Sequence, residues 1–237
     1  MTPATPQLPL ALGLVGPATL AGFVAGDNGT AVQWLQRTAS APAAMQAFLA
    51  GGRDSGKSHL LQAVCRAADE HGHAAVYAPL GLFGDQAAAL LDGLESAALV
   101  CIDDVDAIAG DSGAERALFD LYNRVHDARG GLVLSGSRPP ALLPLELPDL
   151  VSRLAWGACF QLRPLDDPGK LQVLQQRATT LGFELPAEAG DYLLQRSARG
   201  LSDLLRLLDR VDRATLAAQR RVTVPFLRGL LNAAGGG

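Results

Sequence analysis

The residues from Gly51 to Ser58, GGRDSGKS, have the types and spacing needed to bind phosphate. They fit the pattern G-x-x-x-x-G-K-[ST], in which glycines let backbone N–H groups turn inward around phosphate oxygens. Lys57 would supply a positive charge for the β- and γ-phosphates, and the Ser58 hydroxyl would ligate Mg²⁺. The chain has two lysines against eighteen arginines, which weighs against the alternative of a glycine-rich turn with an incidental lysine. We therefore expect a nucleotide-phosphate site made by Gly51, Gly52, Arg53, Asp54, Ser55, Gly56, Lys57, Ser58 and His59.

Two consecutive aspartates, Asp103 and Asp104, follow the apolar run LVCI. Asp103 would hold the Mg²⁺ shell, and Asp104 would polarise a water for attack on the γ-phosphate. An Asp-Asp pair can also be a simple turn after a strand. Its position about 45 residues after the phosphate loop, with one strand between, favours the functional interpretation. Asp54, inside the loop itself, is an unusual residue so close to phosphates, and we expect its carboxylate to point away from them.

A parallel sheet must position these residues. Apolar runs predict strands at 44–50, 74–80, 97–102, 130–137 and 159–165. Between them, 57–71 and 115–129 have the apolar stripe of amphipathic helices. Strands that alternate with helices predict an α/β fold with a five-stranded parallel sheet covered on both faces. Ligands of such sheets bind beyond the carboxyl ends of the strands, where the phosphate loop and the aspartates fall.

The strand signals stop at about residue 166, and the rest of the chain is predicted to be helical. The expected helices span 167–181, 187–197, 201–219 and 224–233. We expect three parts: a tail at 1–12, an α/β nucleotide-binding domain at 13–165, and a small helical domain at 166–237.

Composition restricts the function further. The net charge of −4 argues mildly against a protein that grips nucleic acid by itself. No apolar run approaches the length of a membrane span, and the first residues lack the pattern of a secretion signal. The three cysteines, Cys65, Cys101 and Cys159, are widely spaced and are expected to be reduced core thiols, not metal ligands. A cytoplasmic protein is expected.

Taken together, the motifs resemble those of the AAA+ module of the bacterial replication initiator DnaA, and in particular the Hda type of short DnaA-related regulator. The resemblance spans nearly the whole chain. It is carried by GGRDSGKSHL (51–60), VCIDDVDAIAG (100–110), LSGSRPP (134–140), LPDLVSRLAWG (147–157), GFELP (182–186), LDRVDRA (208–214) and GDN at 26–28. DnaA itself also has a C-terminal helix-turn-helix domain that binds DNA. Here the sequence stops after the helical part, which the resemblance identifies as a lid, so no autonomous sequence-specific DNA binding is expected.

The resemblance implies roles for further residues. The polar end of the fourth strand, from Ser135 to Ser137, corresponds to sensor 1, with Ser137 as the candidate, although the family usually has an acid or an amide there. Arg153 corresponds to the arginine finger, which would reach a neighbour's nucleotide; the alternative is a surface arginine at a helix end. Sensor 2 should be an arginine, but Ser202 stands at that position. Arg199 or Arg206 lies about one turn away and would have to substitute.

Three functions remain open at this stage. The first is a regulator that holds ADP or ATP with Mg²⁺, docks beside ATP-loaded DnaA and inserts Arg153 to trigger hydrolysis there. The second is an autonomous ATPase, similar to DnaA or to a helicase loader, that acts on its own nucleotide. The third is a small-molecule kinase, which the scattered arginines of the helical part disfavour. Self-association is compatible with each of them.

The N-terminal tail contains a separate motif, PQLPLAL at 6–12. Gln7, Leu8, Pro9 and Leu10 resemble the peptide with which Hda-type proteins dock on the β sliding clamp of DNA polymerase III. Two leucines seated in a pocket would contribute about 1.5–3 kcal/mol each. The prolines at 3, 6 and 9 would reduce the cost of ordering the tail by holding it extended. The alternative is a tail that folds back onto its own domain.

Overall fold

The computed structural model describes residues 18–196, 200–218 and 222–234. Its centre is a five-stranded parallel sheet, as the sequence predicts, and the strands lie in the order β2-β3-β4-β1-β5. The strands are β1 (Gln46–Ala50), β2 (Ala75–Pro79), β3 (Leu99–Asp103), β4 (Gly131–Gly136) and β5 (Ala158–Gln161). β1 pairs with both β4 and β5, in the registers Ala50↔Gly136 and Ala47↔Ala158.

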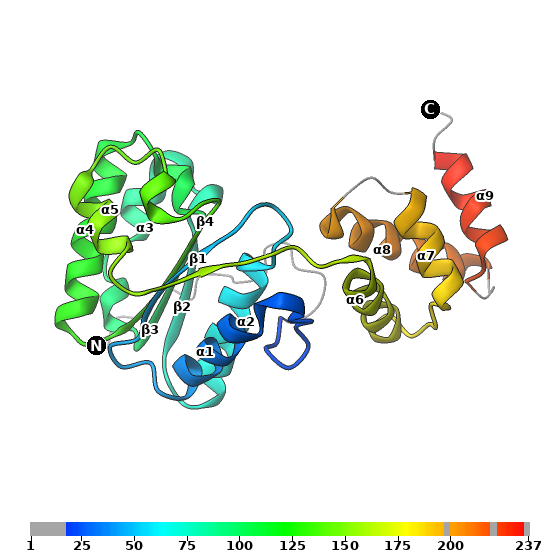
Figure 1. Cartoon of the computed structure of the whole chain (residues 1–237), viewed down its shortest axis with the longest axis horizontal. Coiled ribbons are helices and arrows are strands. Elements are labelled where there is room, and N and C mark those ends of the chain that lie inside the picture. The colour runs from blue at the N-terminus through cyan, green and yellow to red at the C-terminus, as the bar shows by residue number, and fades with distance from the viewer. Residues whose placement is uncertain (1–17, 197–199, 219–221, 235–237) are drawn as a thin grey trace, which may run out of the picture.

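Helices cover both faces of the sheet (Figure 1). One face packs against α1 (Gly29–Ser40) and α2 (Lys57–Glu70), and the other against α3 (Ala87–Leu90), α4 (Ser112–Asp127) and α5 (Pro148–Leu154). Along β1, Phe48 and Ala50 belong to one core, whereas Ala47 and Leu49 belong to the other. Successive side chains of a strand point to opposite faces, so a strand buried on both sides is apolar throughout. The 3-10 helix η1 (Gly26–Asn28) directly precedes α1. Other short 3-10 helices lie between these elements: η2 (Leu80–Leu82), η3 (Gly84–Gln86), η4 (Leu94–Ser96), η5 (Val105–Ile108) and η6 (Pro140–Leu142).

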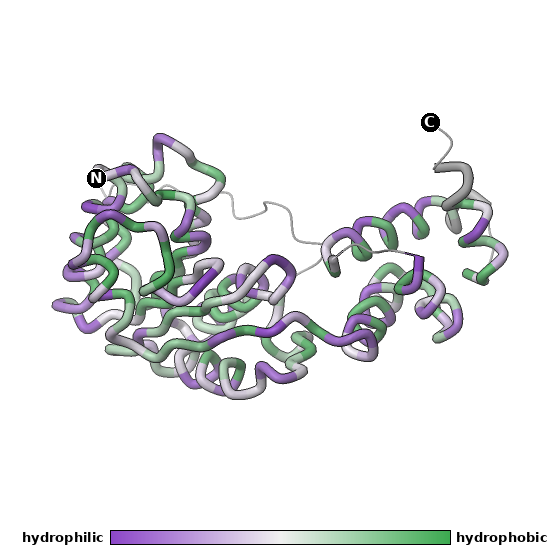
Figure 2. The backbone as a smooth tube through the Cα atoms, turned by 45° about the horizontal axis from the view of Figure 1, so that its top comes forward, coloured by the Kyte–Doolittle hydropathy of each residue, from purple (hydrophilic) through white to green (hydrophobic). Residues whose placement is uncertain are grey.

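The C-terminal part is a separate helical layer, here called the lid. It consists of α6 (Asp167–Thr180), α7 (Ala187–Arg196), α8 (Leu201–Ala218) and α9 (Val224–Ala234). Hydrophobic and hydrophilic stretches alternate along these helices (Figure 2), which matches helices that bury one face against one another. The buried side chains form a core of their own, including Leu174, Leu193, Leu204, Leu208, Val211 and Leu227.

Some expected elements differ in the structure. The helix predicted from residue 115 begins at Ser112, because the Asp111 carboxylate accepts hydrogen bonds from two backbone N–H groups of the first turn. The last strand is shorter than predicted, since the chain leaves the sheet after Gln161 and runs toward the lid. α1 and the short α5 were not predicted. Cys65 and Cys101 are buried, but Cys159 is exposed, so the expectation of a core thiol is wrong for that residue.

A buried carboxylate fixes the segment that leads into α5. Glu115 is 1% exposed and accepts hydrogen bonds from the backbone N–H groups of Gly110, Glu146 and Leu147, at 2.7 to 3.1 Å. Such charge-assisted bonds are stronger than neutral ones. The start of α5 is therefore anchored to α4, which is relevant because α5 carries Arg153.

No helix in the described part of the chain is both long and apolar enough to cross a membrane.

Candidate nucleotide-binding site

The phosphate loop follows β1 directly and ends at the start of α2, as the motif requires. Gly56 has φ of +93°, and a Cβ there would lie 2.7 Å from Phe23 Cε2, so both the backbone and the space require glycine. Asp54 also has a positive φ, 61°. The Lys57 ammonium donates to the carbonyl oxygens of Gly51 and Gly52, at 2.8 and 3.2 Å. The lysine charge is thus held over the loop.

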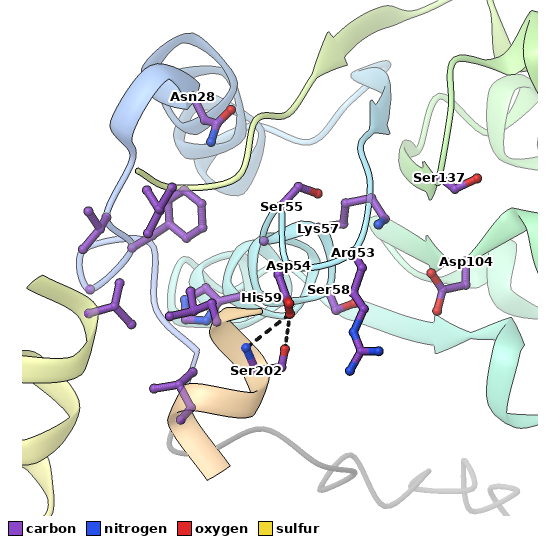
Figure 3. A pocket seen from close by; sticks show the side chains of 18 residues that line it. Asn28, Arg53, Asp54, Ser55, Lys57, Ser58, His59, Asp104, Ser137 and Ser202 are labelled. Atoms are coloured by element: carbon purple, nitrogen blue, oxygen red, sulfur yellow. Dashed lines mark hydrogen bonds between the residues drawn. The ribbon is translucent and has the colours of Figure 1, made fainter. Parts of the chain in front are cut away.

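A cavity of about 510 Å³ opens over this loop (Figure 3). One part of its lining is polar and comes from the phosphate loop, the end of β3 and the loop after β4. The other part is apolar and comes from the chain before α1, the connection to the lid, and the lid helices themselves. The apolar lining residues are Phe23, Val24, Leu165, Val173, Leu201 and Leu205. Concave sites with a mostly apolar wall and a few convergent polar groups are typical of cofactor pockets.

The two aspartates after β3 have different environments. Asp103 is 1% exposed and accepts hydrogen bonds from the Tyr77 hydroxyl, at 2.7 Å, and from the Ser135 hydroxyl. Asp104 lines the cavity and has a left-handed backbone, with φ of 57°. Desolvation raises the pKa of Asp104, repulsion from Asp103 adds to the rise, and Lys57 opposes it. A carboxylate with a raised pKa is a better proton acceptor, which suits the expected role of Asp104. Asp103 is not a lining residue, so its expected place in the Mg²⁺ shell stays a prediction.

Ser137, the sensor 1 candidate, also lines the cavity. Its backbone N–H donates to Asp106 Oδ2 at 2.7 Å, and its hydroxyl bonds to Asp106 Oδ1. Asp106, which the sequence reasoning did not single out, therefore fixes Ser137 at the edge of the sheet. Ser135 is fully buried and bonds to Asp103 instead.

The lid meets the phosphate loop at Asp54. Its carboxylate accepts hydrogen bonds from the backbone N–H of Ser202, at 3.3 Å, and from the Ser202 hydroxyl (Figure 3). The guanidinium of Arg53, in the loop, lies 3.9 Å from the carboxylate of Asp203, which follows Ser202 on α8. Ser202 lines the cavity, whereas Arg206 is not a lining residue and its guanidinium bonds to Asp203. Arg199 lies outside the described residues.

The far wall of the cavity is closed by the segment that includes GDN at 26–28. Asn28 is buried, and its side-chain amide both donates to the Arg163 carbonyl and accepts from the Arg163 N–H, at 2.9 and 2.8 Å. His59 lies beside Phe23, with ring centroids 5.5 Å apart. Burial lowers the pKa of His59, and a contact with the Thr19 carbonyl partly opposes the effect. His59 therefore belongs to the wall on the Phe23 side.

Residues 17–161 match the family of the bacterial DnaA ATPase domain. The chain belongs to the DnaA family of AAA+ proteins. Residues 167–231 match a second family, the lid domain of Hda. The DnaA-type ATPase domain and the Hda-type lid together make this an AAA+ protein related to replication initiation.

Solved structures agree with the DnaA-family fold. Domain III of the DnaA protein from Thermotoga maritima superposes with a TM-score of 0.82 at 22% identity, covering 93% of this chain and 98% of that one. AMPPCP-bound DnaA from Aquifex aeolicus gives 0.68 at 22% identity, covering 84% and 66%. The RuvB Holliday junction branch migration motor of Thermotoga maritima gives 0.70 at 18% identity, covering 92% and 72%. At these identities the likeness concerns the fold.

The donors of this DnaA-family chain fit a nucleoside phosphate with Mg²⁺. The loop, Lys57 and the start of α2 offer positive charge and N–H donors, which suit phosphate. Among the described residues, no group of three or more His, Cys, Asp or Glu side chains could hold a metal ion by itself. A magnesium ion here would thus depend on phosphate oxygens, together with Ser58 and one or two carboxylates, which is its usual mode of binding.

The remaining predicted residues lie elsewhere. Arg153 is half-buried near the end of α5 and is not among the residues that line the cavity. Gln7, Leu8, Pro9 and Leu10 lie outside the described residues. Sequence reasoning missed the apolar wall. Its members come from segments that are far apart along the chain, and no local spacing marks them.

Proposed function

We propose that this DnaA-family chain is a nucleotide-bound regulator of replication initiation that stimulates ATP hydrolysis by DnaA through Arg153, and so prevents re-initiation. The observation that carries the proposal is the position of Arg153 relative to the chain's own phosphate loop. The loop follows the carboxyl end of β1, whereas Arg153 precedes the amino end of β5.

Because the strands are parallel, these two positions lie at opposite ends of the strands: the loop at the carboxyl ends and Arg153 at the amino ends. Ala47, near the start of β1, is paired with Ala158, the first residue of β5. A strand of five residues separates its two ends by roughly 15 Å. In addition, α5 and the lid lie on opposite sides of the domain that contains the sheet (Figure 1). An arginine at the amino ends of the strands is badly placed to reach the nucleotide bound by the same chain. It is well placed to reach a nucleotide held by a neighbouring molecule.

The chain's own residues have complementary tasks in this proposal. Lys57 and the loop N–H groups hold the phosphates of ADP or ATP, the apolar wall encloses the base, and Ser58 with Asp103 holds Mg²⁺, which would neutralise phosphate charge. Arg153 of this chain donates to the γ-phosphate of the ATP that the partner holds, as negative charge spreads over the phosphate oxygens. A finger of this kind accelerates hydrolysis by about 10³- to 10⁵-fold in other nucleotide hydrolases.

A second function, hydrolysis of the chain's own ATP, is favoured by one observation. Asp104 lines the cavity, and its raised pKa suits a proton acceptor. The substitution at the sensor 2 position opposes it, because Ser202 brings no positive charge to the phosphates. Single-turnover assays with the chain alone, with ATP-loaded DnaA alone and with both together separate the two functions. Our proposal requires acceleration only in the mixture; turnover by the chain alone at the rate of the mixture would support the second function.

We further propose that Gln7, Leu8, Pro9 and Leu10 dock on the β sliding clamp of DNA polymerase III. Clamps loaded on DNA would then confine the regulator to the period after initiation. Single-site affinity is expected to be roughly micromolar, and several identical pockets on the clamp ring would raise it by avidity. The acidic chain would work in the cytoplasm without sequence-specific DNA binding of its own, and self-association is compatible with this scheme.

The double variant Gln7→Ala with Leu8→Ala tests this docking. We expect it to lose clamp binding in a surface-immobilised clamp assay while its melting temperature and nucleotide binding stay those of the parent. Clamp binding that survives, or a large fall in melting temperature, would show that these residues serve the fold.

A further inference from the structure

The guanidinium of Arg153 stacks on an exposed tryptophan. Its Cζ atom lies 4.0 Å from the ring centroid of Trp156, three residues further along the chain. Trp156 is 58% exposed, so the stacked pair lies at the protein surface. A guanidinium over the face of an indole is attracted by the electron density of the ring, and its flat shape matches the flat surface below it.

The indole is itself held by a chain of contacts that reaches the sheet. The ring of His126, on α4, meets Trp156 edge-on, with centroids 6.0 Å apart and an angle of 71° between the planes. His126 Nδ1 is 3.0 Å from Gln46 Nε2, and the Tyr122 hydroxyl donates to Gln46 Oε1 at 2.7 Å. Gln46 is the first residue of β1, so these contacts tie the Trp156 indole to the sheet.

The residue after Trp156 fixes its distance from the sheet. A Cβ atom on Gly157 would overlap the backbone carbonyl of Gln46. Glycine thus allows the chain to pass close to the start of β1 and places the indole next to His126. Arg153, Trp156, His126 and Gln46 together form what we call the arginine platform.

We propose that Trp156 is a positioning residue for the arginine finger: its ring face holds the Arg153 guanidinium in the orientation that meets a partner's phosphates. The proposal rests on the proposed function of Arg153. An unsupported arginine side chain samples many rotamers, and each that points elsewhere lowers the fraction of docked complexes able to react. The ring limits this sampling before docking occurs.

The test compares two replacements of Trp156 in single-turnover hydrolysis by ATP-loaded DnaA, measured over a range of regulator concentrations. Trp156→Leu keeps a large apolar side chain but removes the aromatic face, whereas Trp156→Phe keeps a smaller aromatic face. For an exposed pair of this kind we expect Trp156→Leu to lower the maximal rate about two- to fivefold. The concentration that gives half-maximal stimulation should remain unchanged, and Trp156→Phe should recover most of the rate.

Two outcomes would overturn the positioning role. One is a Trp156→Leu variant with the maximal rate of the parent. The other is a change confined to the half-maximal concentration, which would make Trp156 a docking contact. Arg153→Ala in the same assay keeps the two proposals distinguishable. If Arg153→Ala stimulates DnaA fully, the proposed function fails. If Arg153→Ala is inactive while Trp156→Leu keeps the maximal rate of the parent, only the role of Trp156 fails.

Tryptophan fluorescence tests the stacking itself without DnaA. The chain has one other tryptophan, Trp34, so the Trp34→Phe background reports Trp156 alone. Arg153→Ala should uncover one face of the indole and increase its quenching by acrylamide, and Arg153→Lys should give an intermediate value. Equal quenching in all three proteins would contradict the stacked arrangement.

Discussion

Asp54 of the phosphate loop and Ser202 of the lid, 148 residues apart in the chain, are joined by two hydrogen bonds. The Asp54 carboxylate lies at the start of α8, where a helix offers unpaired N–H groups and the positive end of its dipole. The carboxylate therefore caps a lid helix from another domain. This explains how an acidic residue is accommodated in a phosphate loop, since its charge is engaged by the lid. Ser202, which the resemblance assigns to the sensor 2 position, thus joins the lid to the loop.

The first prediction concerns Gly200, the residue before α8. A Cβ there would overlap the Asp54 carboxylate, so Gly200→Ala should break the contact between lid and loop. We expect a fluorescent ADP analogue to dissociate about three- to tenfold faster in stopped-flow measurements, which is the effect of losing about 1 kcal/mol of hydrogen bonding. Gly229→Ala is the matched control, because nothing lies within 4 Å of a Cβ at that exposed position of α9. Equal dissociation rates for both variants and the parent would refute the role of the contact.

The second prediction uses the two lysines of the chain. Lys57→Ala should remove nucleotide binding, because the point charge over the loop is lost. For the parent, ADP at a hundred to a thousand times its Kd should add about 3–4 kcal/mol to the free energy of unfolding, and for Lys57→Ala it should add almost nothing. Lys170→Ala, which removes an ion pair with Asp167 on the lid, should keep the full effect. Thermal unfolding with and without ADP measures both, and an ADP-stabilised Lys57→Ala would contradict the site.

The third prediction concerns pH. Burial lowers the pKa of His59 in the folded chain below the value of about 6.5 that it has when unfolded. Between these two pKa values the unfolded chain binds more protons, so stability rises with pH. The contribution of neutral His59 to the free energy of unfolding is complete above about pH 6.5 and is lost as the pH falls through the pKa that His59 has in the folded chain. His59→Gln should therefore lose less stability between pH 7.5 and pH 5 than the parent does.

Urea unfolding of the nucleotide-free protein at several pH values measures this difference. The same substitution at His71, which is exposed at the end of α2, is the control. Identical pH slopes for the parent and His59→Gln would show that another group dominates acid sensitivity.

The sequence predicted what local spacing encodes. The phosphate loop, Asp104 at the cavity and five parallel strands follow from short apolar runs and the residues at their ends, which a parallel sheet brings to one edge. The sequence did not predict the contact from Asp54 to Ser202, because nothing local marks two residues on different domains as partners. The same holds for Phe23, Val173 and Leu205, which meet only when the lid packs beside the loop. Arg153 and Trp156 are close in the sequence, yet their stacking and the exposure of the indole are visible only in the folded structure.

The central claim is that this chain acts on a partner's nucleotide through Arg153. The most direct measurement is the single-turnover rate of hydrolysis by ATP-loaded DnaA mixed with the parent, Arg153→Ala, Arg153→Lys or Arg196→Ala. Arg196, an arginine beside the ring of Tyr192 on the lid, is the control for loss of a similar side chain elsewhere. We predict that Arg196→Ala matches the parent and that both Arg153 variants leave DnaA at its unstimulated rate, because lysine cannot offer the planar fork of donors. Full stimulation by Arg153→Ala, with its fold and bound nucleotide intact, would contradict the account.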